Sequence, residues 1–327
     1  MKKRVFSGVR PTGRLHLGNY LGAIKNYVTL QDEYDCVYSI VDLHALTTME
    51  ETGKIKDNVR EVLLDFLAAG LDPTRSTIFV QSQVPEVTEL YTILGMLTPL
   101  SWLLRVPTFK EKVKMQPHNV NYGLVGYPVL MTSDILTYKA EVVPVGEDQL
   151  PHLELAREIV RRFNEHFGPV FAEPQAKLTN YPLVVGLDGH DKMSKSLNNH
   201  IELAATADET AKKIMSAVTD PARKLRSDPG HPEVCNVYKL QRCFNSMRVA
   251  DITNECQEAK IGCVDCKRLL AEAVNTDLAP LRERRIALAA HPEEIDRILQ
   301  GGAERAGTVA RATITEVKQS VGLSLAI

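Results

Sequence analysis

The fold is decided by residues 5–19, which read Val5-Phe-Ser-Gly-Val-Arg-Pro-Thr-Gly-Arg-Leu-His-Leu-Gly-Asn19. Residues 5–9 have the composition of a strand, and a helical pattern over 20–30 follows the turn. Glycines at 13 and 18 permit a sharp turn, and a helix start directs free N–H groups at any bound phosphate. His16 and Asn19 add directed donors. The segment predicts a strand, a phosphate-binding turn and a helix, with a plain helix start as the alternative.

The rest of the first half alternates in the same way. Strand patterns recur at 36–41, 76–81 and 142–145, between helical patterns at 54–69, 86–104, around 130 and at 150–167. This spacing predicts an α/β fold with a doubly wound parallel sheet. After about residue 200 the pattern becomes helical, at 207–218, 237–250, 266–274, 278–290, 295–299 and 303–320. We expect one domain over 1–200, with a helical insertion at about 85–140, and a helical domain over 201–327.

Composition bounds the function without deciding it. The 327 residues are 44% hydrophobic, enough for a large core, and 39 basic against 41 acidic residues give a net charge of −2. This balance does not mark a nucleic-acid binder, but local patches such as Arg223-Lys-Leu-Arg226 or Arg282-Glu-Arg-Arg285 permit one. Each patch alone fits a solvated helix face equally well. Without a long apolar run or a signal-peptide pattern, we expect a cytoplasmic protein with no membrane partner.

A second motif carries two lysines on a loop. It reads Asp188-Gly-His-Asp-Lys-Met-Ser-Lys-Ser-Leu197, with Lys192 and Lys195 among small, flexible residues. Such a loop can fold over a triphosphate, where lysines stabilise the charge that develops as the α-phosphate is attacked. The motif predicts a nucleotide-binding loop.

Together the two motifs resemble the HIGH and KMSKS signatures of the class I aminoacyl-tRNA synthetases, in the right order and about 175 residues apart. Asn19 replaces the second histidine, as expected of the tryptophanyl branch. That branch is also similar in Phe6-Ser-Gly-Val-Arg-Pro-Thr-Gly13, Val41-Asp-Leu-His-Ala-Leu46, Tyr127-Pro-Val-Leu-Met-Thr-Ser-Asp-Ile-Leu136 and Val145-Gly-Glu-Asp-Gln149. The resemblance implies a Rossmann-like catalytic domain, an anticodon-binding helical domain, and a homodimer that loads tryptophan onto tRNA(Trp) with ATP.

The pattern around Asp134 agrees with a tryptophan pocket. Tyr127, Met131 and Asp134 follow i, i+4, i+7 spacing and share one helix face. A buried carboxylate needs a donor, and an indole N–H is suitable. The resemblance assigns Asp134 to the indole nitrogen, and an aspartate that caps a helix is the alternative. The residues expected to enclose the ring are Phe6, Gly8, Met131, Val143 and Val145.

Further roles are implied by the resemblance alone. Tyr127 and Gln149 would hold the substrate α-amino group, with His44 near its carboxylate. The catalytic group would be Thr12, His16, Asn19, Lys192 and Lys195. The ATP site would comprise Arg10, Pro11, Thr12, Gly18, Asn19, Gly146, Glu147, Asp148, Val185, Lys192, Met193, Ser194, Lys195 and Ser196. Mg²⁺ is expected on the phosphates, with no carboxylate identifiable as its dedicated ligand.

Five of the six cysteines fall within 32 residues, which in a cytosolic chain suggests metal more than disulfides. Four thiolates suit Zn²⁺ or a [4Fe-4S] cluster. Gly230-His-Pro-Glu-Val-Cys-Asn-Val237 and Gly262-Cys-Val-Asp-Cys266 resemble an iron-sulfur subset of the tryptophanyl branch, which implies the ligands Cys235, Cys256, Cys263 and Cys266. The distance from Cys235 to Cys256 departs slightly from that subset, so Cys243 is the alternative first ligand.

Three other functions explain less of the sequence. A tyrosyl-tRNA synthetase shares both motifs, but its pocket has a tyrosine where this chain has Phe6-Ser-Gly8. A nucleotidyltransferase lacks a reason for the KMSKS loop and the helical second half. A non-catalytic iron-sulfur RNA-binding protein leaves two intact ATP motifs unexplained.

Overall fold

The protein is built on a parallel sheet. The computed structural model describes residues 2–48, 52–178 and 184–323. Its strands are β1 (Arg4–Val9), β2 (Asp35–Ile40), β3 (Ser76–Val80), β4 (Val142–Val145) and β5 (Gln175–Leu178). They pair in parallel in the order β3-β2-β1-β4-β5. The predicted α/β fold with a doubly wound sheet is confirmed. The edge strand β5 was not predicted because Gln-Ala-Lys-Leu lacks a strand-like apolar pattern.

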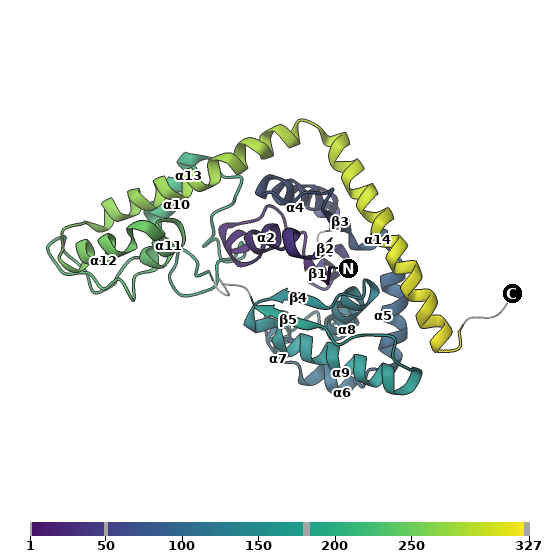
Figure 1. Ribbon diagram of the computed structural model, residues 1–327. Helices are drawn as coiled ribbons and strands as arrows, with labels where there is room; N and C mark the ends of the chain where they lie inside the picture. Colours follow the sequence, from purple (N-terminus) through teal and green to yellow (C-terminus); the bar gives the residue numbers. More distant parts are fainter. Residues whose placement is uncertain (1, 49–51, 179–183, 324–327) are drawn as a thin grey trace.

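Successive residues of the central strands enter two different cores. Val5 and Tyr38 pack on one face, with helices α2 (Lys25–Glu33) and α4 (Ile55–Ala69). Phe6 and Val37 pack on the other, with α5 (Glu86–Leu97), α8 (Tyr122–Thr137) and α9 (Leu150–Phe167). The side-chain period of two directs neighbouring residues to opposite faces, so both faces of the sheet are covered. Figure 1 shows these helices on the two sides of the sheet.

Short elements lie at the strand ends. After β1 come α1 (Leu17–Asn19) and the π-helical turn η1 (Tyr20–Ile24), and α3 (Asp42–Ala45) follows β2. The single helix predicted over 86–104 is wrong, because Thr98 precedes Pro99 and is extended at ψ 115°. The other short elements are η2 (Thr52–Lys54), η3 (Gln81–Gln83), α6 (Leu100–Arg105), α7 (Pro107–Met115), η4 (Glu147–Gln149) and η5 (Ser246–Arg248).

Only helices occur among the described elements after residue 200. They are α10 (Ala207–Ser216), α11 (Asn236–Phe244), α12 (Val249–Gln257), α13 (Cys263–Ala289) and α14 (Pro292–Ser320). The last two were each expected as a pair of helices. The polar stretch 275–277 does not interrupt α13. Asn275 donates a hydrogen bond to the Ala207 carbonyl, and Asp277 forms an ion pair with Lys25. Gly301 and Gly302 are no break either.

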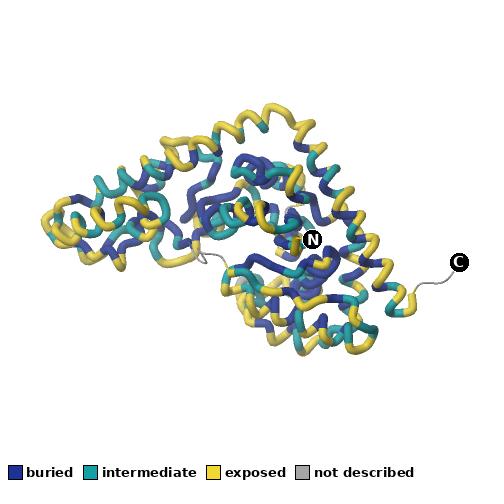
Figure 2. The backbone as a smooth tube through the Cα atoms, viewed as in Figure 1, coloured by how far each residue is buried: buried dark blue, intermediate teal, exposed yellow. Residues whose placement is uncertain are grey.

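Helix α14 returns to the sheet and covers its edge. A Cβ added to Gly302 would lie 1.7 Å from the carbonyl oxygen of Ile78 in β3, so only glycine permits this approach. An uncovered edge strand would expose unpaired backbone groups. Figure 2 shows the buried stripe of α14 turned toward the sheet and an exposed stripe turned away. No helix in the described part of the chain is long and apolar enough to cross a membrane.

Candidate active site

The predicted ligand-binding residues, together with Gln81, which was not predicted, cluster at the carboxyl ends of the strands. Residues 10–19 follow β1, His44 follows β2, Gln81 follows β3 and residues 146–149 follow β4. Strand β1 lies between β2 and β4, so the chain changes direction across the sheet there. Open parallel sheets bind ligands in the crevice at such a switch point. The strand order therefore fixes where the site lies.

His16 is the N-cap residue of α1, at the end of the turn that follows β1. Its Nδ1 accepts a hydrogen bond from the Gly18 N–H (3.1 Å), and the Asn19 side chain accepts one from the His16 N–H (3.1 Å). Burial lowers the pKa of His16 to about 3, and the positive charges of His200, Lys195 and Lys192 act in the same direction. The ring is therefore neutral at pH 7. With Nδ1 as acceptor, Nε2–H is left as a donor.

The lysine loop closes on this turn. Lys195 Nζ donates to the carbonyl oxygen of Thr12 (2.9 Å), while Met193 is buried, with its Cβ 3.3 Å from where a Cβ on Gly18 would stand. Val185 pairs with Lys192 in an isolated antiparallel bridge. Lys192 and Ser196 are exposed, and the hydroxyls of Ser194 and Ser196 lie 3.3 Å apart. The two motifs thus come together across the sequence gap between them.

Asn199 braces the loop, and sequence reasoning missed it. Its buried side chain accepts from the Ser194 N–H (2.7 Å) and donates to the Asp188 carboxylate (2.6 Å) and the Lys192 carbonyl (3.3 Å). Gly186 makes room for it, because a Cβ there would lie 2.1 Å from Asn199 Nδ2. The loop therefore has a defined closed conformation.

The carboxylate of Asp134 is buried and lies within hydrogen-bond distance of two side chains. Its oxygens lie 2.8 and 2.9 Å from Gln81 Nε2, and Oδ2 lies 2.9 Å from His44 Nε2. Asp134 is in the middle of α8 and its side-chain partners are Gln81 and His44, so the alternative of a helix cap is wrong. A carboxylate has about four acceptor positions, so it can accept one more donor.

Tyr127, on the same face of α8 as Asp134, belongs to a second cluster of polar side chains. Its hydroxyl lies 2.6 Å from Thr108 Oγ1 and 2.7 Å from His152 Nε2, and Lys112 Nζ stands 3.4 Å from its ring centroid. Burial, together with the charge of Lys112, lowers the pKa of His152 to about 4. Burial also lowers the pKa of Lys112 to about 8, and the charge of Arg10 is the second contribution to this shift. The α7 segment therefore lies over the site.

The other predicted residues form two groups, an apolar wall of the proposed site and a rim at its edge. Phe6, Val143 and Val145 are buried in one core cluster, against which Met131 packs, and Phe6 stacks on Tyr138 at 5.5 Å. Gly8 has little room for a side chain, because a Cβ there would lie 2.8 Å from Val41 Cγ1.

On the rim, Gln149 donates to Asp148 (2.7 Å), and Glu147 and Asp148 are exposed beside Gly146. Arg10 contacts Thr48, and Pro11 is buried. Two of the missed residues had a signal in the sequence. Gln81 ends a predicted strand, and His152 follows Val145-Gly-Glu-Asp-Gln149 closely.

Four of the five clustered cysteines have thiols near one another. Burial raises the pKa of Cys235 and of Cys256. Burial also raises the pKa of Cys266, which reaches about 11. Other thiols of this group, Cys263 among them, contribute to all three shifts. Cys243 lies elsewhere, with Sγ 3.6 Å from the Lys239 carbonyl. Within the described residues, no three or more His, Cys, Asp or Glu side chains are arranged to hold a metal ion. The four predicted thiols therefore lie near one another, but the described side chains are not arranged as metal ligands.

Arginines of both basic runs take part in intramolecular contacts, although Lys224, Arg226 and Arg284 are exposed. Arg223 donates to the Arg226 carbonyl (2.8 Å), and Arg226 lies 3.8 Å from Asp265. Arg282 and Arg285 face α10 and α4. Two of the three arginines in the second run therefore pair within the protein.

Comparison with known proteins places the chain in a family. Residues 1–279 match the family described as tRNA synthetases class I (W and Y). The chain belongs to this family of class I aminoacyl-tRNA synthetases. A tryptophan–tRNA ligase of Thermotoga maritima is 44% identical over 98% of this chain and 99% of that protein. One from Aquifex aeolicus is 38% identical over 98% of this chain and 100% of that protein. The structure of tryptophanyl-tRNA synthetase from Campylobacter jejuni, complexed with ADP and tryptophan, is 36% identical with a TM-score of 0.87, covering 98% and 100% of the two chains.

Proposed function

We propose that this enzyme is a tryptophan–tRNA ligase that activates L-tryptophan with ATP and transfers the aminoacyl group to the 3′ end of tRNA(Trp). Its similarity to tryptophan–tRNA ligases along 98% of the chain carries this conclusion. The site agrees with it, since a buried carboxylate and a lysine loop lie at the same edge of the sheet.

The reaction needs no protein nucleophile. A carboxylate oxygen of tryptophan attacks the α-phosphorus of ATP in line, the bond to the bridging oxygen breaks, and pyrophosphate leaves. A ribose hydroxyl of the tRNA then attacks the aminoacyl carbonyl and AMP leaves. We propose that Lys192 and Lys195 stabilise the phosphate charge, while Thr12, His16 and Asn19 orient it. The neutral His16 ring, with Nε2–H as donor, is suited to a phosphate oxygen.

We propose that Asp134 accepts the indole N–H. Gln81 and His44 hold the carboxylate in place and leave an acceptor position for the substrate. The apolar wall for the ring would be Phe6, Gly8, Met131, Val143 and Val145. A site with a buried acceptor rejects side chains that lack a donor, because the acceptor would stay unpaired.

The remaining contacts that we propose are those implied by membership of the family. Tyr127 and Gln149 would bind the α-amino group, with His44 toward the carboxylate. The ribose and adenine would lie against Gly146, Glu147, Asp148 and the backbone of Val185, with Arg10, Pro11, Gly18, Met193, Ser194 and Ser196 around the phosphates. Mg²⁺ would neutralise the phosphate oxygens of ATP.

For the second half of the chain we propose tRNA binding. Residues 201–327 would form the anticodon-binding domain, beyond the catalytic domain over 1–200 with its insertion at about 85–140. Translation in the cytoplasm is the setting that this activity requires.

We further propose a metal centre with the ligands Cys235, Cys256, Cys263 and Cys266, as a [4Fe-4S] cluster rather than Zn²⁺. The proximity of these thiols and the separate position of Cys243 support it. Protein purified without oxygen should be brown, with broad absorbance in the violet-blue. Cys263→Ser should abolish this colour and Cys243→Ser should keep it. Colourless protein with one zinc per chain would reject the cluster.

A homodimer is the assembly that we propose, through α5, α6 and the start of α8. Met96, Leu100, Leu104 and Tyr122 are large apolar side chains exposed there, and Trp102 lies between them in sequence. Patches of this kind mark protein interfaces. Light scattering should give twice the chain mass, and the double variant Met96→Glu, Leu100→Glu should give a monomer. A monomeric wild type would reject the dimer.

The activity itself is tested by ATP–pyrophosphate exchange with each of the twenty amino acids. We expect exchange with tryptophan alone. Exchange driven by tyrosine in its place would overturn the proposed substrate.

A further inference from the structure

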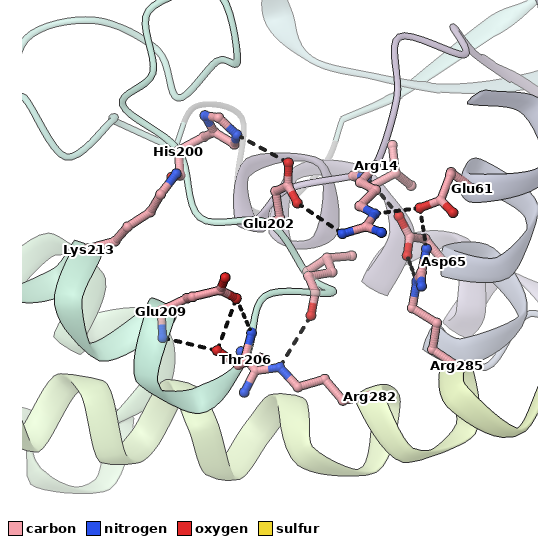
Figure 3. A network of polar contacts seen from close by, with 12 residues as sticks. Arg14, Glu61, Asp65, His200, Glu202, Thr206, Glu209, Lys213, Arg282 and Arg285 are labelled. Atoms are coloured by element: carbon pink, nitrogen blue, oxygen red, sulfur yellow. Dashed lines mark hydrogen bonds and ion pairs between the residues drawn. The ribbon is translucent and has the colours of Figure 1, made fainter. Parts of the chain in front are cut away.

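A chain of ion pairs lies next to the phosphate-binding turn, between α4 and α13, buried at Asp65, largely buried at Arg285 and partly exposed at Arg14 and Glu202 (Figure 3). Asp65 on α4 is fully buried, and its carboxylate accepts from the Leu15 N–H (2.7 Å) and from Arg285 Nε (2.7 Å). Arg285 also donates to Glu61 (2.5 Å), which accepts from Arg14 Nε (2.6 Å). A long-range pair, 3.8 Å, joins Arg14 to Glu202. The network thus connects the turn, α4, α13 and the segment after the lysine loop.

This network holds the backbone that carries His16. The Leu17 N–H donates to the Ile201 carbonyl (2.9 Å), and the Leu203 N–H donates to the Leu15 carbonyl (2.9 Å). His16 therefore lies in a short antiparallel pairing with the segment that follows the lysine loop. Asp65 fixes the same stretch from beneath, through the N–H of the residue before His16.

Helix α13 contacts both sides of this pairing. Arg285 reaches Asp65 under the turn, and Arg282, one turn earlier, donates to the Leu203 carbonyl (3.3 Å) and to Thr210 Oγ1 (2.7 Å). In Figure 3 the two arginines rise from the same helix toward the two segments. These two arginines therefore connect α13 to both segments of the pairing, to Leu203 directly and to Leu15 through Asp65.

The charges of the network also act on the lysine loop. Burial lowers the pKa of Lys195, and the negative charges of Glu202 and Asp65 oppose that shift. Both carboxylates are thus within electrostatic range of the ammonium that we place on the ATP phosphates. An unneutralised Asp65 would repel those phosphates, and Arg285 prevents this by pairing with it.

We propose that Asp65 and Arg285 are positioning residues for the ATP step, which tie the phosphate-binding turn to α13 and cancel the buried negative charge below it. The proposal rests on the tryptophan-activating function and adds to it. It makes the position of α13, a helix of the proposed anticodon-binding part, a determinant of ATP binding.

The test measures the KM of both substrates in ATP–pyrophosphate exchange. Arg285→Ala leaves the buried Asp65 without its charged partner and removes the tie to α13, so we expect the KM for ATP to rise about 10-fold with the KM for tryptophan within about twofold of wild type. Adding Asp65→Asn, which removes the unpaired charge and keeps an acceptor for Leu15, should recover most of the loss. Arg285→Lys should lie between Ala and wild type, because it keeps the charge without the two-pronged geometry.

A matched control is Arg60→Ala. Arg60 lies on the same helix as Asp65 and pairs with Asp296 on α14 (2.8 Å), without contact to the turn. Its KM values should stay at the wild-type level. Melting temperatures show which variants fold. If Arg285→Ala does not fold, the single variant Asp65→Asn, which is nearly isosteric, takes its place in the KM measurements.

Equal rises in both KM values, or no rescue by Asp65→Asn, would overturn the positioning role. These results differ from a failure of the proposed function, in which wild-type protein shows no tryptophan-dependent exchange at all.

Discussion

At the scale of single residues, the account depends on Asp134. Its carboxylate is buried at 2% exposure and held by Gln81 and His44, so it is fixed before a substrate enters. Asp134→Asn keeps the shape but removes the charge and turns an N–H₂ group toward one partner. We expect kcat/KM for tryptophan in exchange to fall about 100-fold, with the KM for ATP little changed.

A matched control for this change is Glu89→Gln on α5, the helix that packs beside α8. Glu89 pairs with Lys318 at the surface, so its variant should retain wild-type kinetics. Equal losses in the two variants would show that Asp134 acts through stability rather than through the substrate.

The residues of the site were predictable to different degrees. Asp134 and Tyr127 could be placed on one face because a single helix carries both and its period is known. Gln81 and His152 come from other elements, and only the strand order brings them to Asp134 and Tyr127. Asp65 and Arg285 lie 220 positions apart, and nothing local marks them as partners.

At the scale of elements, the lysine loop depends on one asparagine. Asn199→Ala removes three hydrogen bonds that hold Ser194, Asp188 and the Lys192 backbone. The loop should then close less often, and kcat for exchange should fall about 10-fold with the KM for tryptophan unchanged. The measurement is steady-state exchange at saturating ATP.

The neighbouring residue supplies the control. Asn198 is exposed at φ 51°, a conformation that glycine adopts freely, so Asn198→Gly should leave kcat unchanged. If both variants lose activity equally, chain flexibility rather than the Asn199 brace limits the rate.

Elements with a clear apolar period were predicted well, and those placed by tertiary contacts were not. The boundaries of β4 and α9 match the expected 142–145 and 150–167 because each has a strong local pattern. By contrast, β5 is an edge strand of low β-propensity that pairing with β4 imposes. The run of α14 through Gly301 and Gly302 reflects packing on β3, which no local pattern indicates.

At the scale of the whole molecule, buried histidines link stability to pH. Burial lowers the pKa of His152 to about 4 and that of His16 to about 3, against about 6.5 in an unfolded chain. Below pH 6.5 the unfolded chain takes up protons that the native protein does not. Their contribution to stability is therefore complete above pH 6.5 and is lost as the pH falls toward 4 for His152 and toward 3 for His16, at up to about 1.4 kcal/mol per pH unit for each histidine.

Guanidinium unfolding at pH 7 and pH 5 checks this linkage. His152→Gln should reduce the loss of unfolding free energy between the two pH values. His166→Gln, on the exposed side of the same helix, should not. Identical losses in His152→Gln and wild type would contradict the linkage.

The central claim is that this protein recognises tryptophan through the N–H of its indole ring, and an analogue tests it directly. Benzothienylalanine replaces that N–H with sulfur at nearly the same shape. In ATP–pyrophosphate exchange we expect its kcat/KM to lie about 1,000-fold or more below that of tryptophan, because the remaining acceptor position of Asp134 would be left without a donor. We also expect Asp134→Asn to discriminate far less between the two. Equal activity of the wild-type enzyme with both amino acids would contradict the account.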